Sequence, residues 1–292
     1  MRLIFWCYFA SLAHVAGAQT PGGLSDSTTF WIKANNGTSS TVPNGSIGTW
    51  QDQSPFAKDV SQVTQGKQPK FTVSNINYNP SVHFDGVNDY LRVDLGTDEY
   101  TSEFNFFIVV KLNSNTNLGA VFHNHSTTSG DIDLTSFQFD SNGSTYRYRN
   151  NSDINGVNGL PFSTYNTNFR LFSIRSYGEN NNTAVKAFEN GVIVGSAQFT
   201  GQNRGQRFRD YFLGANRIAV VSNSGTFSNN YTAEVIIIPK DLSEDDRRKV
   251  ETYLAVKYGF TLSNVGSGVK GDYVATNDAL LWDASLAGGY HN

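Results

Sequence analysis

Carboxylates gather in one short stretch of the chain, where Asp85, Asn88, Asp89 and Asp94 surround a predicted tight turn. Carboxylate and amide oxygens on loops are the hard ligands that Ca²⁺ prefers, so Asp85, Asp89 and Asp94 are candidate ligands of a structural calcium ion. The same residue types also shape turns, because Asp and Asn side chains accept hydrogen bonds from nearby backbone amides. The pattern therefore leaves two interpretations open, a calcium site and a self-capped turn.

A second candidate site lies at residues 146–149, where tyrosine and arginine alternate. In a strand this spacing places Tyr146 and Tyr148 on one face. If exposed, the two rings would offer a flat surface to a sugar ring, with the amides of Asn142 and Asn150 close enough for its hydroxyls. An ordinary strand with its tyrosines inward and its arginines in water has the same pattern, so both interpretations stay open.

The residue sets that catalysis requires do not occur. Glycoside cleavage needs two carboxylates, yet Glu234 in a buried predicted strand has no second acid at the spacing Glu-x-Asp-x-x-Glu. The chain also lacks a Gly-x-Ser-x-Gly elbow and a His-Glu-x-x-His motif. His123 and His125 share one face of a predicted strand, but no third metal ligand can be assigned, and they are interpreted as exposed histidines at a strand end. The sequence therefore predicts a protein that is not an enzyme.

The elements that would position these residues are mostly strands. Residues 104–112 are almost continuously apolar, which is typical of a central strand covered on both faces. Residues 169–175 alternate, and residues 232–238 form another buried strand that ends before Pro239. The Asn190-Gly191 pair between two β-favouring runs predicts a hairpin with a type I′ turn.

One helix is predicted over residues 244–258. Ser243 is the candidate N-cap, and Asp246 stands three residues further on, as in a capping box. Gly259 suits a left-handed C-cap, so the helix is expected to end there. We expect it to lie against the sandwich edge.

The composition fits an exported all-β protein. Only 16% of the residues are charged, 13% are aromatic, and Asn, Ser, Thr and Gly supply most of the polar surface. Residues 1–18 place one arginine before an apolar run and end in Ala-Gly-Ala, which predicts a signal peptide. Its removal takes away Cys7, the single cysteine, and moves the formal charge from −3 to −4. A nucleic-acid partner is therefore not expected, and the rest of the chain has no apolar run long enough for a transmembrane helix.

Five motifs occur along the chain: Phe-Trp-Ile-Lys-Ala at 30–34, Trp-Gln-Asp-Gln-Ser at 50–54, Phe-Asp-Gly-Val-Asn-Asp-Tyr-Leu at 84–91, Ala-Glu-Val-Ile-Ile at 233–237 and Tyr-Leu-Ala-Val-Lys-Tyr-Gly at 253–259. Together they resemble laminin-G/concanavalin A-like jelly-roll domains, specifically those near the N-terminus of large surface proteins that are exported by the type IX secretion pathway. The resemblance implies an all-β fold, a two-sheet antiparallel jelly-roll sandwich with one short C-terminal helix. It covers most of residues 19–262, while residues 263–292 are predicted to be a linker and the start of a truncated further segment. Pro55 departs from the pattern, which has glycine there.

These observations predict a non-catalytic recognition module, with a glycan as its most plausible ligand. Neutral amides and hydroxyls match sugar hydroxyls without a large desolvation cost. A structural spacer or a protein–protein adhesion domain is the alternative, and a glycoside hydrolase is the third class. The expected location is outside the cell or on the surface of a Gram-negative bacterium, in a chain that continues into further domains.

Overall fold

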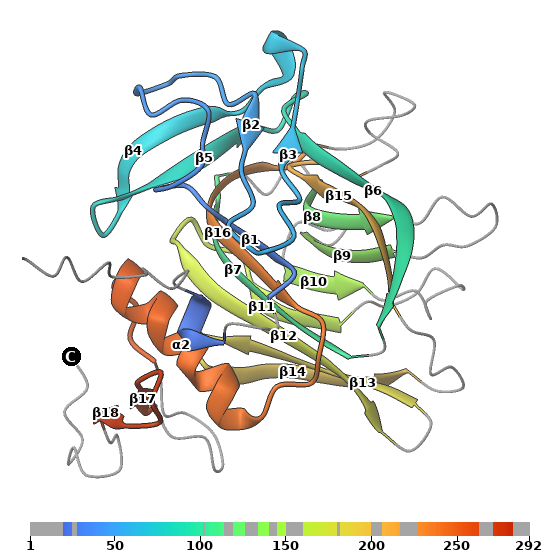
Figure 1. Cartoon of the computed structure of the whole chain (residues 1–292), viewed down its shortest axis with the longest axis vertical. Helices are drawn as coiled ribbons and strands as arrows, with labels where there is room; N and C mark the ends of the chain where they lie inside the picture. The colour runs from blue at the N-terminus through green and yellow to red at the C-terminus, as the bar shows by residue number, and fades with distance from the viewer. Residues whose placement is uncertain are drawn as a thin grey trace, which may run out of the picture.

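The computed structural model describes most of the chain and shows an all-β protein (Figure 1). The predicted signal peptide and most of the predicted linker lie outside the described residues. These comprise residues 20–24, 28–101, 103–113, 119–125, 134–139, 145–149, 160–179, 182–199, 206–216, 227–262 and 271–282.

Two large antiparallel sheets form the sandwich. Sheet A contains β1 (Phe30–Lys33), β4 (Lys70–Ile76), β5 (Asn79–Asp85), β7 (Phe104–Leu112), β12 (Arg170–Glu179), β13 (Asn182–Glu189), β14 (Val192–Phe199) and β16 (Asn229–Ile238). Sheet B contains β2 (Thr49–Trp50), β3 (Val60–Ser61), β6 (Leu91–Thr101), β8 (Ala120–His125), β9 (Leu134–Phe139), β10 (Thr145–Arg149), β11 (Leu160–Thr164) and β15 (Gln206–Leu213).

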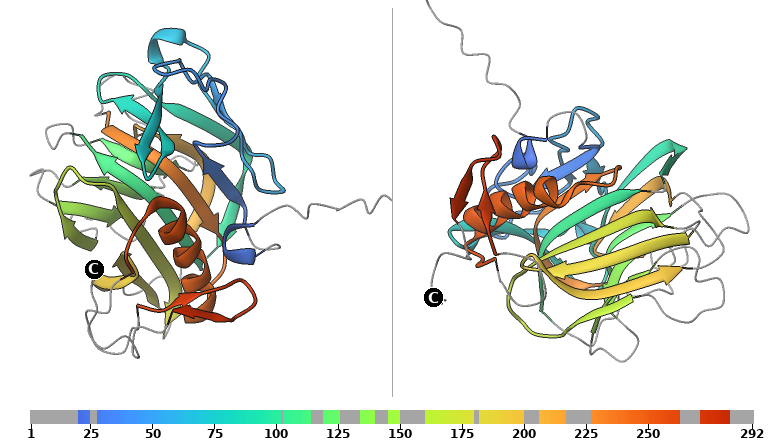
Figure 2. Two further views of the ribbon diagram at one scale, coloured as in Figure 1. Left: turned by 90° about the vertical axis from the view of Figure 1, so that its left-hand side faces the viewer. Right: turned by 90° about the horizontal axis from the view of Figure 1, so that it is seen from below.

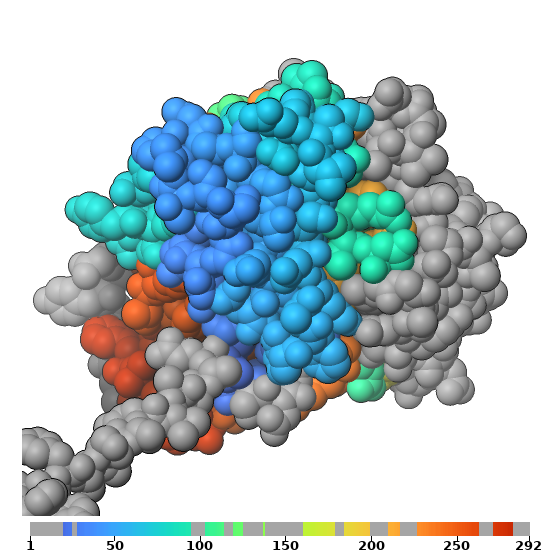
Figure 3. Space-filling model, turned by 45° about the horizontal axis from the view of Figure 1, so that its top comes forward, coloured from blue at the N-terminus to red at the C-terminus, as the bar shows by residue number. Residues whose placement is uncertain are grey.

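The strand order brings distant parts of the chain together. Sheet A runs β14-β13-β12-β7-β16-β5-β4, and sheet B runs β11-β10-β9-β8-β15-β6-β3-β2. Strand β16 pairs with β7 along one edge, while its other edge is shared by β5 and then β1. The segment from β1 to β3 therefore passes from sheet A to sheet B, and it covers the middle of one face in the space-filling view (Figure 3). The predicted two-sheet sandwich is confirmed.

The core has two layers, one between the sheets and one outside sheet A. Strand β7 serves both, since Phe106 and Ile108 face the layer between the sheets and Phe107 and Val109 face the outer layer. This arrangement explains why the strand is apolar along nearly its whole length, as predicted. The outer layer needs a cover, because strands with two apolar faces are stable only when both are buried.

Helix α2 (Glu244–Tyr258) provides that cover. The predicted bounds are confirmed: the Ser243 hydroxyl accepts a hydrogen bond from the Asp246 amide at 3.1 Å, and Gly259 adopts a left-handed φ of 74°. The predicted hairpin is confirmed as well, with positive φ values of 48° at Asn190 and 80° at Gly191 between β13 and β14. No helix among the described residues has the length and apolar character needed to cross a bilayer.

Three short elements complete the described fold: the 3₁₀ turns η1 (Pro21–Gly23) and η2 (Gln65–Lys67), and a small hairpin made of β17 (Tyr273–Val274) and β18 (Leu280–Trp282). The η1 turn packs closely on helix α2, because a Cβ atom on Gly22 would lie 2.7 Å from the Val250 amide nitrogen. Helix α2 and the small hairpin lie on the same side of the sandwich (Figure 2).

Candidate functional site

A buried carboxylate lies at the centre of the face that helix α2 covers. Glu234 on β16 has no solvent exposure, and it pairs in register with Lys33 on β1 and with Val109 on β7. The register between β16 and β7 shifts between Thr232 and Glu234. Because Val109 belongs to the outer core layer, its register partner Glu234 faces helix α2 rather than the space between the sheets.

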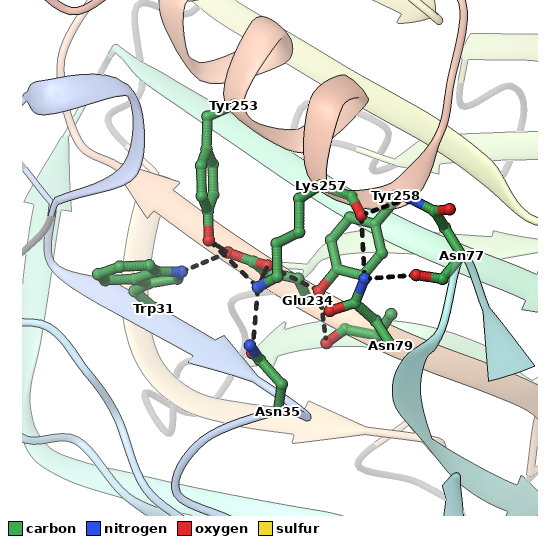
Figure 4. Close-up of polar contacts among 9 residues, drawn as sticks. Trp31, Asn35, Asn77, Asn79, Glu234, Tyr253, Lys257 and Tyr258 are labelled. Carbon is green, nitrogen blue, oxygen red and sulfur yellow. Dashed lines mark hydrogen bonds and ion pairs between the residues drawn. The ribbon is translucent and has the colours of Figure 1, made fainter. Parts of the chain in front are cut away.

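Four donors surround this carboxylate (Figure 4). One oxygen accepts from Trp31 Nε1 at 2.5 Å and from the Tyr253 hydroxyl at 2.9 Å. The other accepts from Lys257 Nζ at 2.7 Å and from the Tyr258 hydroxyl at 2.8 Å. Each oxygen thus has two partners, and the carboxylate has a cation beside it. These hydrogen bonds and the nearby cation offset the desolvation cost of a buried carboxylate.

The electrostatics keep the two tyrosines in their donor form. Burial first, and then the charge of Glu234, raise the pKa of the Tyr253 hydroxyl far above its usual range. The same causes raise the pKa of Tyr258. Both hydroxyls therefore stay protonated, and the Glu234 carboxylate keeps these two hydrogen bonds.

The sequence places these donors through helix spacing and capping. Tyr253 and Lys257 stand four residues apart, so they lie on one face of α2, and Tyr258 follows directly. The end of the helix is fixed from the turn between β4 and β5, where the Asn77 and Asn79 side-chain amides donate to the Lys257 carbonyl at 3.0 and 2.9 Å. These contacts satisfy a carbonyl that the helix end would leave unpaired, and they hold the Lys257 backbone in place.

A groove of about 680 Å³ borders the Glu234 network. Its walls come from η1, β1, helix α2 and the β17–β18 hairpin, and they include Trp31, Lys33, Tyr253 and Lys257. The hairpin is tied to the helix, since the backbone amide of Val274 donates to the Thr252 hydroxyl at 3.0 Å. Volumes of this size hold small organic ligands.

The lining of the groove contains cations but no acids. Lys33, Lys249 and Lys257 contribute to the walls, and none of the described lining residues is an aspartate or a glutamate. Glu234 lies behind the wall, buried and fully paired. The described part of the chain also has no group of three or more His, Cys, Asp or Glu side chains that could hold a metal ion. The groove is thus suited to binding by hydrogen bonds and positive charge.

The candidate calcium ligands divide between two places. The Asp85 carboxylate accepts hydrogen bonds from the backbone amides of Val87 and Asn88 at 2.7 and 3.2 Å, and Asp89 accepts from the Asp85 amide at 3.1 Å. Asp94 pairs instead with Arg92 at 3.2 Å. The bonds around Asp85 and Asp89 are those of a self-capped turn, and calcium at this turn stays a prediction.

Burial changes the chemistry of this turn. It raises the pKa of Asp89 to about 7, and the neighbouring charge of Asp85 acts in the same direction. A carboxyl with such a pKa exchanges a proton near neutral pH, so the turn titrates in a range where an isolated aspartate would not.

The candidate glycan residues lie in sheet B, which contributes none of the described residues that line the groove. Tyr146 and Tyr148 belong to β10, and Tyr148 pairs in register with Phe137 and Leu160, two core residues. Asn142 and Asn150 lie outside the described residues. A sugar platform on β10 therefore stays a prediction.

The interpretation of the histidines was wrong for one of them. His123 is buried and its ring lies 6.0 Å from that of Phe212, so it is not an exposed side chain at a strand end. The error arose because alternation in a strand does not reveal what covers the outer face of a sheet.

Comparison with solved structures shows the fold. A sialidase from Trypanosoma rangeli in complex with sialic acid superposes with a TM-score of 0.54 at 14% identity, over 84% of this chain and 34% of that one. A second structure of the T. rangeli sialidase gives 0.51 at 12% identity, again over 84% and 34%. Domain 4 of a GH43 extracellular arabinanase from Geobacillus stearothermophilus, in complex with arabinotriose, gives 0.48 at 12% identity, over 78% and 98%. The chain thus spans about a third of the sialidases, and identities this low indicate a shared β-sandwich alone.

Sequence comparison adds one partial match. The model of a family described as a domain of unknown function, DUF8202, matches residues 246–292, which run from helix α2 through the β17–β18 hairpin. No curated protein matches the chain. The resemblance to laminin-G domains and the type IX pathway stays a prediction, as does the domain boundary after residue 262.

Sequence reasoning did not find the groove. It noted Glu234 as a buried acid without a partner carboxylate, but its partners are donors rather than acids. Trp31 lies 203 residues away in sequence, and Tyr253, Lys257 and Tyr258 lie 19 to 24 residues away. The available signal was a glutamate inside an otherwise apolar strand, which requires buried donors.

Proposed function

We propose that this protein is a non-catalytic module that binds a glycan in the groove beside Glu234. The observation that carries the proposal is a groove whose walls are fixed by a hydrogen-bonded network and whose described lining contains cations and hydroxyls but no carboxylate. We further propose that the module belongs to a secreted or surface-exposed multidomain protein, as its predicted signal peptide suggests.

The charge of the lining supports binding rather than cleavage. Glycoside hydrolysis needs two carboxyl groups about 5 to 10 Å apart on either side of the scissile bond. Glu234 is buried behind the wall, and both of its oxygens are occupied by donors. A sugar in the groove would thus meet no acid and base among the described lining residues.

The kinds of groups in the lining support a glycan as the ligand. Thr20 and Thr276 line the groove together with the three lysines, so the lining residues carry hydroxyl and ammonium groups. Sugars present hydroxyls to such polar groups. The sialidase that shares the fold was solved in complex with sialic acid, and this parallel suggests the same ligand class.

A glycan array tests the proposal. The expected result is binding of the parent protein to a subset of saccharides and loss of that binding in Val256→Trp, because the larger ring fills the groove from an exposed helix position. Val42→Trp is the matched control, since Val42 has nearly the same exposed fraction, 65% against 64%, and is not among the lining residues. Silence of the parent at high protein concentration would favour a structural spacer. Release of reducing sugar from polysaccharides would contradict the non-catalytic assignment.

The array also bears on calcium, which we propose as a structural ion at the Asp85–Asp89 turn. Repeating it with chelator separates a role in binding from one in stability. A bound ion would raise the melting temperature by mass action, so chelator should lower the melting temperature of the parent protein. It should have no such effect on Asp85→Asn, and an unchanged parent would leave only the self-capped turn.

A further inference from the structure

Two of the three lysines that line the groove are paired with acids. Lys249 Nζ lies 2.6 Å from Asp278 and 3.1 Å from Asp246. Lys257 Nζ lies 2.7 Å from the buried carboxylate of Glu234. The positive charges of these two lysines are therefore balanced within the protein, and they add little net attraction for an anion in the groove.

Lys33 differs from both. Its ammonium lies 3.9 Å from the centroid of the Trp31 ring. Within the described part of the chain, this ammonium makes neither a hydrogen bond nor an ion pair. Burial first, and then the charge of Lys257, lower the pKa of Lys33, while the Glu234 carboxylate opposes this shift. Among the described lining residues, Lys33 is thus a partly dehydrated cation that has no ion pair with an acid, and an incoming anion would supply that partner.

We infer that the ligand of the groove is an acidic saccharide, whose carboxylate or sulfate group pairs with the ammonium of Lys33. This inference rests on the proposed glycan-binding function and narrows it to one ligand class. A lysine ammonium is a compact point charge with three donors, so it binds either a carboxylate or a sulfate. None of the described lining residues is an acid, and the neighbouring acids Asp246, Asp278 and Glu234 are each paired with a lysine.

The aromatic residues in the walls support charge rather than stacking as the main attraction. Trp31 is only 3% exposed, its ring has the Lys33 ammonium over it, and its indole N–H is bound to Glu234. Tyr253 is half-buried, and its hydroxyl also donates to Glu234. Neither ring offers a free face comparable to the stacking platforms that bind neutral sugars. A neutral sugar would therefore gain little here, whereas an anion gains an ion pair in a partly dehydrated site.

The test uses pairs of saccharides that differ only in charge. Trigalacturonate is compared with its methyl ester, and a sulfated carrageenan oligosaccharide with its desulfated form, by calorimetry at physiological salt. We expect at least one acidic member to bind about tenfold or more tightly than its neutral partner, and the two pairs separate carboxylate from sulfate recognition. In Lys33→Gln this preference should fall to less than threefold.

The matched control is Lys111→Gln. Lys111 also places its ammonium over an aromatic ring, 4.9 Å from the centroid of Tyr231, but it does not line the groove. This variant should retain the full preference for the acidic saccharide. Because Lys33 has no ion pair in the described structure, its replacement should leave the fold intact, and an unchanged melting temperature checks this.

The other outcomes overturn either the acidic-saccharide inference alone or the proposed glycan-binding function with it. Equal binding of acidic and neutral saccharides, or a preference that survives Lys33→Gln, overturns the inference and leaves the proposed function standing. Absence of binding by all saccharides overturns both. A triglutamate peptide that binds as tightly as trigalacturonate overturns the assignment to saccharides, because the site would then recognise carboxylates on any backbone.

Discussion

The two halves of helix α2 both bury charge against sheet A, but they do so differently. In the N-terminal half, the guanidinium of Arg247 is fully buried, pairs with the equally buried Glu251, and lies 3.9 Å from the centroid of the Phe188 ring. Glu251 also accepts a hydrogen bond from the Ser173 hydroxyl at 2.6 Å. These groups are enclosed by the strands below and are not among the described residues that line the groove.

In the C-terminal half, the buried acid is Glu234 and its cation is Lys257, whose side chain is 14% exposed and lines the groove. The charges of Lys257 and Glu234 both act on the pKa of Lys33, which has no ion pair with an acid in the described part of the chain. The buried guanidinium of Arg247 therefore holds the helix in place from within the core. Ammonium groups on flexible stems at a groove can instead reach both the protein and a ligand.

The largest effect is expected where both partners are fully buried. Glu251→Gln removes the fully buried anion of Arg247 and leaves that guanidinium with the half-exposed Glu244 as its acidic partner, so it should lower the free energy of unfolding by about 3–5 kcal/mol. Chemical denaturation measures this loss. The double variant Arg247→Met with Glu251→Leu should recover most of it, because apolar residues of similar volume need no pairing. No recovery would mean that packing rather than charge sets the cost.

The same substitution in the other half should cost less. Glu234→Gln turns one acceptor oxygen into a donor that faces other donors, but the Lys257 ammonium can turn toward water. We expect a loss of about 2–3 kcal/mol. It should also weaken glycan binding, since Trp31 and Tyr253 lose their anchor, whereas Glu251→Gln should leave affinity unchanged in the folded protein. If both variants changed affinity alike, the two halves of the helix would not be distinct.

A smaller difference is expected between the two lysines of the C-terminal half. Lys257→Gln removes the cation of Glu234 but leaves three neutral donors, and it should cost about 1–2 kcal/mol. Lys33→Gln removes no ion pair and should stay within about 0.5 kcal/mol of the parent. Thermal unfolding of both variants provides the comparison, and a large loss in Lys33→Gln would show that this lysine is structural.

A separate comparison concerns the pH dependence of stability at the Asp89 turn, which lies outside helix α2. The folded pKa of about 7 lies above the ordinary value of 3.8, so the folded state binds more protons between these values. The stability contribution of Asp89 is therefore complete below about pH 4 and is lost as the pH rises through 7.

Unfolding experiments at a series of pH values test whether stability falls as the pH rises. Asp89→Asn keeps an acceptor for the Asp85 amide without a charge, and it should make the decline in stability between pH 4 and 7 shallower. Asp245→Asn, at an exposed position in the first turn of the helix, serves as the control. An unchanged slope in Asp89→Asn would show that the turn is solvated in the folded protein.

Much of the fold could be predicted because its signals are local. The helix bounds follow from Ser243 and Gly259, and the hairpin follows from Asn190 and Gly191, whose left-handed backbone was the expected one. The two-sided apolar character of β7 indicated a covered central strand. Each of these signals lies within one element and depends on backbone preferences or periodicity.

The candidate site could not be predicted in the same way. Its central acid and its indole donor are joined through the pairing of β1 with β16, at opposite ends of the chain. The motif Trp-x-Asp-x-Ser likewise gave no role for Asp52, whose carboxylate accepts from the Trp31 amide at 2.8 Å and so helps to position this residue. Spacing along the sequence contains no record of such long-range contacts.

Chemical shifts provide the most direct test of whether the C-terminal half of helix α2 borders a ligand site. NMR spectra of the backbone amide and indole N–H groups would be recorded with and without the saccharide that binds most strongly on the array. Shifts are predicted for the Trp31 indole N–H and the Val256 amide, while the Arg247 amide in the other half of the helix should not move. Shifts confined to Tyr146 and Tyr148 on β10 would contradict the groove and would place the ligand on sheet B.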